Sequence, residues 1–120
     1  MNNRLSESEG EMRIWLIGAD EAGSEVLRQI QKNPNIEVIV TDTTDRPKAV
    51  LDRVIEKVDA VENVTQVNIN TLAKRLRPDL ILIDSGAAKR NLSRLSGAMV
   101  YAEAFQNEMA AISDFPCIII

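Results

Sequence analysis

Residues 13–23 read RIWLIGADEAG, and this stretch decides the fold. An apolar run ends in a glycine turn, and Val26, Leu27 and Ile30 then follow at the spacing of one helix face. A strand that passes through a tight turn directly into a helix is the opening unit of a parallel α/β sheet. The rest of the chain repeats this alternation.

Six runs rich in β-branched or apolar residues are candidates for strands: residues 13–18, 36–42, 64–69, 79–84, 98–102 and 117–120. Helical patterns separate them at residues 21–32, 46–61, 71–76, 89–95 and 103–113. The run DLILID (79–84) is apolar on both faces, which is typical of parallel strands covered by helices on both sides. The sequence therefore predicts a three-layer, doubly wound α/β domain with a parallel sheet of order 3-2-1-4-5-6.

The chain of 120 residues has the length and composition of one domain. Residues 1–11, MNNRLSESEGE, are polar and lack apolar periodicity, so we expect a disordered tail there. The Rossmann-like domain should occupy residues 12–120, because no linker or internal repeat interrupts them.

Composition argues against several classes of function. The chain contains no histidine and one cysteine, which removes histidine-based catalysis, an internal disulfide and a structural zinc site. A net charge of −4 and 3% aromatic residues disfavour nucleic-acid binding. No apolar run approaches the ~20 residues that span a bilayer, and no signal peptide is recognisable. We expect a cytoplasmic protein with no metal site, no nucleic acid partner and no membrane insertion.

A candidate ligand loop lies where the first strand meets the first helix, the position of the dinucleotide fingerprint G-x-G-x-x-G. It consists of Gly18, Ala19, Asp20, Glu21, Ala22 and Gly23. Asp20 replaces the second glycine of the fingerprint, and Asp42 ends the next strand at the offset of a carboxylate that contacts ribose hydroxyls.

The chain resembles the NAD(P)-binding Rossmann superfamily, and most closely the TrkA-type nucleotide-binding domains that regulate potassium transport. The segments that carry this resemblance are RIWLIGADEAGSEVL and IEVIVTD. The resemblance implies a small regulatory domain that senses a bound nucleotide, dimerises and performs no chemistry. It also implies that Gly18, Ala19, Glu21, Ala22 and Gly23 form the pyrophosphate loop and that Asp42 contacts the ribose.

Asp20 leaves three hypotheses open for this loop. The loop binds NAD(H), NADP(H) or another adenine nucleotide, or it binds S-adenosylmethionine, whose positive charge tolerates an acidic neighbour. In the third hypothesis it binds nothing, and Asp20 caps the following helix with its own carboxylate in the amide pocket that would hold a phosphate.

Ser85 and Gly86 follow the fourth candidate strand, at the switch point where doubly wound sheets bind ligands. They could line the same crevice beside the second ribose or the nicotinamide, or form an ordinary turn.

Oxidoreductases of this superfamily need a substrate domain to orient hydride transfer, and residues 12–120 hold no room for one. We therefore expect no catalytic residues, and a nucleotide-binding or nucleotide-sensing regulatory module that is a homo-oligomer or part of a larger chain. The alternative is a degenerate Rossmann-like domain that serves protein association only and binds no cofactor.

Overall fold

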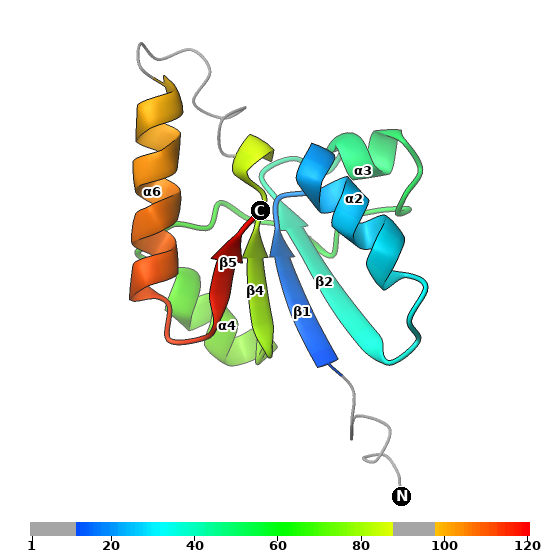
Figure 1. The fold of residues 1–120 in the computed structure, drawn as a ribbon, viewed down its shortest axis with the longest axis horizontal. Coiled ribbons are helices and arrows are strands. Elements are labelled where there is room, and N and C mark those ends of the chain that lie inside the picture. The colour runs from blue at the N-terminus through cyan, green and yellow to red at the C-terminus, as the bar shows by residue number, and fades with distance from the viewer. Residues whose placement is uncertain (1–11, 88–97) are drawn as a thin grey trace, which may run out of the picture.

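The computed structural model of the protein describes residues 12–87 and 98–120. Five strands make one parallel sheet in the order β3-β2-β1-β4-β5 (Figure 1). They are β1 (Met12–Ile17), β2 (Ile36–Asp42), β3 (Ala60–Val61), β4 (Leu80–Ile83) and β5 (Cys117–Ile119). The predicted fold class is confirmed, with β1 at the centre and the Rossmann-like order 3-2-1-4-5; the described residues contain five strands where six were expected.

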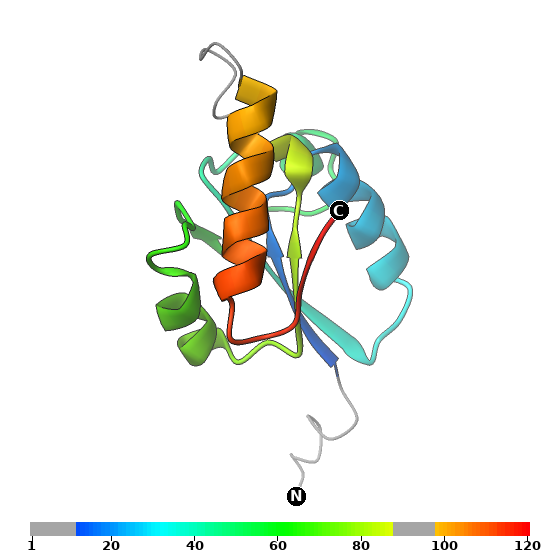
Figure 2. The same ribbon diagram turned by 60° about the vertical axis from the view of Figure 1, so that its left-hand side comes forward.

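Helices cover both faces of this sheet (Figures 1 and 2). One face carries α2 (Glu21–Ile30) and α3 (Lys48–Leu51), and the other carries α4 (Ile69–Leu76) and α6 (Ala98–Ile112). No helix in the described parts of the chain is long and apolar enough to cross a membrane.

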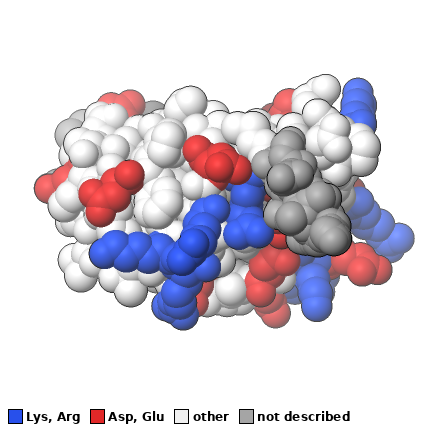
Figure 3. All heavy atoms as spheres, turned by 90° about the horizontal axis from the view of Figure 1, so that it is seen from below, with Lys and Arg blue, Asp and Glu red and all other residues white. Residues whose placement is uncertain are grey.

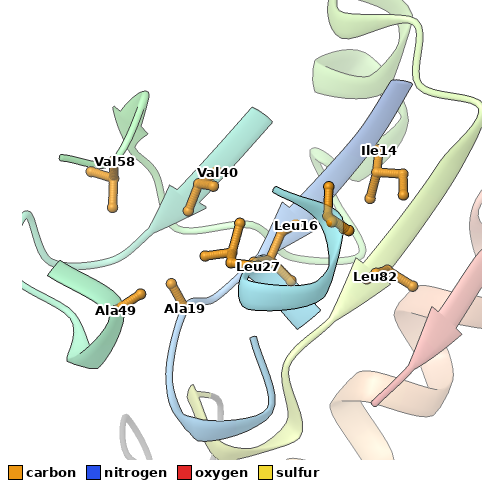
Figure 4. Packing of buried hydrophobic residues seen from close by; sticks show 9 residues of the cluster. Ile14, Leu16, Ala19, Leu27, Val40, Ala49, Val58 and Leu82 are labelled. Atoms are coloured by element: carbon orange, nitrogen blue, oxygen red, sulfur yellow. The ribbon is translucent and has the colours of Figure 1, made fainter. Parts of the chain in front are cut away.

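Two hydrophobic cores follow from this layering, one on each face of the sheet. Figure 4 shows the first, in which Leu27 of α2 and Ala49 of α3 pack on Leu16 of β1 and Val40 of β2. In the second core, Trp15 packs among residues of α4 and α6, and its indole N–H donates to the Thr41 hydroxyl at 3.0 Å. Because β1 sends side chains alternately into both cores, its sequence RIWLI is apolar on both faces.

The strand predicted at residues 64–69 was wrong. The third strand is the two-residue β3, and residues 66–68 form a turn that leads into α4. The Asn68 side chain accepts the Thr65 amide at 2.8 Å and donates to the Asn63 carbonyl at 2.9 Å. Such local bonds compete with a strand ladder, and the apolar Val67 is left 86% exposed.

The helix predicted at residues 46–61 was also too long. Helix α3 ends at Leu51, and Arg53 adopts a left-handed φ of 61° that ends the helical path. The amides of Val54 and Ile55 then both donate to the Ala49 carbonyl, at 2.8 and 3.2 Å. Val54, Ile55 and Val58 still pack against the first core. Leu51 and Val61, which share the same spacing, are 58% and 53% exposed, so the spacing indicated burial correctly for only part of the segment.

The strand predicted at residues 98–102 was wrong too, because these residues begin α6. A five-residue apolar run does not distinguish a buried strand from a helical segment. The predicted helices 21–32, 71–76 and 103–113 correspond to α2, α4 and the later part of α6. The predicted helix 89–95 and the predicted tail 1–11 lie outside the described residues.

Figure 3 views the molecule from the end at which the parallel strands begin. Lysine and arginine side chains lie among aspartate and glutamate side chains on this face. The loops considered as a ligand site lie at the opposite end.

Candidate ligand site at the carboxyl ends of the strands

The turn between β1 and α2 is fixed by two close approaches. Gly18 has a φ of +91°, and a Cβ built on it would lie 2.6 Å from the Ala87 Cβ. A Cβ built on Gly23 would lie 2.7 Å from the Gly18 carbonyl oxygen. Both positions therefore require glycine, and the helix lies close against the strand that precedes it.

Asp84, the residue after β4, holds this turn from behind. Its Oδ2 accepts the amides of Asp20 at 2.8 Å and Gly23 at 2.7 Å, and its Oδ1 accepts the amide of Gly86 at 2.8 Å. The side chain is 1% exposed. One carboxylate thus joins the loop after β1 to the loop after β4.

The buried environment of Asp84 disfavours the ionised form of its carboxyl group. Burial raises the pKa of this carboxyl above its ordinary value, and the backbone amides that donate to it lower the pKa without cancelling that effect. The charge is tolerated because several short hydrogen bonds replace the lost water.

The prediction that the Asp20 carboxylate caps α2 was wrong. Asp20 occupies the N-cap position, but its side chain makes no capping bond. The reason is that Asp84 already accepts the Gly23 amide, one of the two amides that a capping side chain would bind. The Asp20 side chain lies over Gly86 instead, with Oδ2 at 3.1 Å from the position of a Cβ on that glycine.

Asp42 holds the loop from a second side. Its Oδ2 accepts the Ala19 amide at 2.8 Å and its Oδ1 accepts the Thr44 amide at 3.2 Å. The residue is 3% exposed and lines a small cavity at this edge of the sheet. A ribose hydroxyl would have to enter that cavity to reach it, so the predicted ribose contact stays a prediction.

The amides of Glu21 and Ala22 differ from those of their neighbours. They belong to the first turn of α2, and neither donates to an acceptor in the described part of the chain. The loop therefore keeps two amide donors at a helix N-terminus. Of its other amides, Gly18 donates to the Thr41 carbonyl, and the rest donate to Asp42 or Asp84.

The predicted site residues come together at one edge of the sheet, and the crevice between them is largely filled. Ser85 is half-buried, and its amide donates to the Ile120 carbonyl at 3.0 Å. Gly86 meets Asp20, and Ala87 meets Gly18. The loops after β1 and β4 are therefore in direct contact at the switch point.

The cavity beside these loops has a volume of about 60 Å³, and Asp42, Glu62, Asn63 and Asp84 are among its lining residues. This is room for roughly two water molecules. Sequence reasoning missed Glu62 and Asn63 because it placed a strand just after them. No group of three or more histidine, cysteine, aspartate or glutamate residues in ranges 12–87 and 98–120 is arranged to hold a metal ion.

Sequence reasoning also missed the structural role of Asp84. The available signal was an aspartate directly after an apolar strand at the expected switch point, where a buried carboxylate needs several hydrogen-bond donors.

Comparison with known families found no family model that matches this chain, and comparison with curated proteins found no relative. The sheet order and the position of the loop define the class: a Rossmann-like α/β domain.

Proposed function

We propose that the protein is a nucleotide-sensing regulatory module without catalysis of its own, similar in kind to TrkA-type domains, and that it binds an adenine nucleotide through one phosphate group at the first turn of α2. The observation that carries this proposal is the pair of amides of Glu21 and Ala22, which have no acceptor in the described residues. Amides at a helix N-terminus favour a phosphate by hydrogen bonding and by the helix dipole.

Asp84 and Asp42 support this proposal because they hold the loop in place. A loop that is fixed before binding loses little conformational entropy when a ligand arrives. Both carboxylates accept amides of the loop and are almost fully buried, so neither presents an exposed charge to an approaching phosphate.

The filled switch point favours a mononucleotide over NAD(H) or NADP(H). A dinucleotide crosses the crevice between the loops after the first and fourth strands. Here Ala87 lies against Gly18 and Asp20 lies over Gly86. A ligand with a single nucleoside would stay on the β2 side of that contact, next to Asp42.

The small size of the cavity beside the loops after β1 and β4 favours a second candidate function, in which the domain binds no cofactor and serves protein association. Its volume of about 60 Å³ is well below the ~300 Å³ at which small-molecule pockets begin. Phe105 and Ile112 of α6 and Ile118 of β5 are 44%, 48% and 52% exposed, which is apolar surface suited to a second copy. Light scattering over a range of protein concentrations would show a dimer if this candidate is correct.

A thermal-shift titration tests the two candidates. The probes are AMP, ADP, ATP, NAD, NADH, NADPH and S-adenosylmethionine, each with and without magnesium. A ligand at ~100 times its dissociation constant stabilises the native state by about 2.7 kcal/mol, which raises the melting temperature by several degrees.

Two variants at one position identify the binding amide. Glu21→Pro removes the amide at the first helical position, where proline is tolerated, and Glu21→Ala removes the same carboxylate but keeps the amide. We expect an adenine mononucleotide to stabilise the wild type and Glu21→Ala but not Glu21→Pro. A shift with NAD(H) alone would refute the preference for a mononucleotide, and no shift with any probe would leave the association function.

A further inference from the structure

A second cavity is a groove between α4 and the sheet, on the face of the sheet that carries the second core. Its volume is about 270 Å³, against about 60 Å³ for the cavity at the switch point. This is the volume of roughly nine water molecules and is close to the lower end of the range for small-molecule pockets. The groove can therefore hold a small metabolite but not a nucleotide.

The floor of the groove is apolar and the two walls carry opposite charges. Ile39 of β2 and Leu72 and Leu76 of α4 are half-buried members of the second core. Arg75 stands on the α4 wall. Asp59 and Glu62 flank β3 on the opposite wall.

These charges do not neutralise one another. No ion pair within 4.0 Å joins Arg75 to Asp59, to Glu62 or to any other acidic residue of the described segments. Asp59 uses its Oδ2 to accept the Val40 amide at 2.7 Å, which fixes that carboxylate at the edge of the groove. The groove thus keeps a cation and two anions apart, across apolar surface.

Charge complementarity specifies the occupant. A carboxylate fits the guanidinium of Arg75, which can donate two parallel hydrogen bonds, and an ammonium group fits Glu62 and Asp59. The apolar side chain of an α-amino acid extends from the carbon that carries both charged groups, and it would cover Ile39 and Leu72. We propose that this groove binds a small zwitterion with an apolar side chain, of the class of free aliphatic amino acids.

The test is a titration of the ¹⁵N-labelled wild-type protein with L-leucine, followed by amide chemical shifts. Two analogues each lack one charge: 4-methylpentanoate has no ammonium group, and 3-methylbutylamine has no carboxylate. We expect leucine to shift the amides of Ile39, Ala60, Leu72 and Arg75. Each analogue should bind at least about tenfold more weakly, the value of one charge-assisted hydrogen bond.

Two variants on α4 complete the test. Arg75→Gln should weaken leucine binding about tenfold or more, while Lys74→Gln, an equally exposed neighbour outside the groove, should leave it unchanged. Both residues are exposed, so both variants should fold. Equal effects of the two variants, or no shift at tens of millimolar leucine, would overturn the proposal.

Two further outcomes would also overturn it. Shifts confined to residues 18–23 would place leucine at the loop, and shifts of the groove amides that depend on protein concentration without ligand would show that a second copy occupies the groove. The result is independent of the nucleotide titration, because leucine binding is read from the amides of the groove and nucleotide binding from the melting temperature.

Discussion

Replacing Asp84 with asparagine tests the contact that joins the two loops. Asparagine has nearly the same shape but only one acceptor oxygen. If that oxygen faces Asp20 and Gly23, the Gly86 amide faces a donor, and burying it without a partner costs about 1–3 kcal/mol. The two remaining bonds lose their charge assistance, about 1 kcal/mol each.

Part of this loss is offset, because asparagine does not bury a charge, and burial raises the pKa of Asp84. We therefore expect the free energy of unfolding to fall by about 2–3 kcal/mol, a large fraction of the stability of a small domain. Urea denaturation followed by far-UV circular dichroism measures this value, with an unchanged slope confirming that the folded state is intact.

Asp114→Asn is the matched control, since it makes the same chemical change at an exposed position. We expect it to stay within about 0.5 kcal/mol of the wild type. If Asp84→Asn destabilised the protein no more than this control does, the description of Asp84 as the residue that holds both loops would be refuted.

Three other predictions follow from the same geometry. The raised pKa of Asp84 means that the native state binds more protons than the unfolded state. Its contribution to stability is therefore greatest below the unfolded pKa of about 3.9 and falls as pH rises through the folded pKa. Because asparagine does not titrate, the difference in urea midpoint between wild type and Asp84→Asn should grow at acid pH. Gly18→Ala should cost about 2 kcal/mol or more, because φ is +91° and the new Cβ would lie 2.6 Å from the Ala87 Cβ. Gly86→Ala should cost less in the same unfolding assay, because its φ is not positive and its nearest contacts, with Asp20 Oδ2 at 3.1 Å and Asp84 Oδ1 at 3.3 Å, are longer. Burial raises the pKa of the Cys117 thiol to about 11, so iodoacetamide should alkylate it much more slowly at pH ~8 in the native protein than in urea; equal rates would contradict this burial.

The central part of the fold was predictable because several local signals agree there. In residues 13–30 an apolar run, a glycine turn and a helical spacing follow one another, and both glycines prove to be required by close contacts. The parallel pairing of β1 with β2 and β4 follows from strands that are apolar on both faces.

The wrong strand predictions arose where one pattern of residues is compatible with two different structures. Residues 64–69 are rich in β-branched residues, as a strand would be, but Asn68 and Thr65 use their side chains to bond the backbone and form a turn. Residues 98–102 are an apolar run that belongs to α6, and no local signal separates such a run from a buried strand.

The sequence predicted the position of the candidate site but not the hydrogen bonds within it. The sequence placed Gly18, Asp20, Asp42 and Gly86 at one edge of the sheet, where the structure has them. It did not predict that Asp84 would accept the amide expected to bind the Asp20 side chain. That contact joins residues 61 positions apart, and a local pattern carries no information on such a pair.

The distance along the chain between Asp84 and the turn that it holds also has a consequence for folding. Residues 12–42 can form β1, α2 and β2 from contacts that are close in sequence, whereas Asp84 reaches Gly23 only after β4 has paired with β1. Closing such a long stretch of chain is slow compared with forming a helix. The turn at residues 18–23 is therefore completed only after β4 has paired with β1, and a ligand that recognises it would bind only molecules in which these two strands are paired.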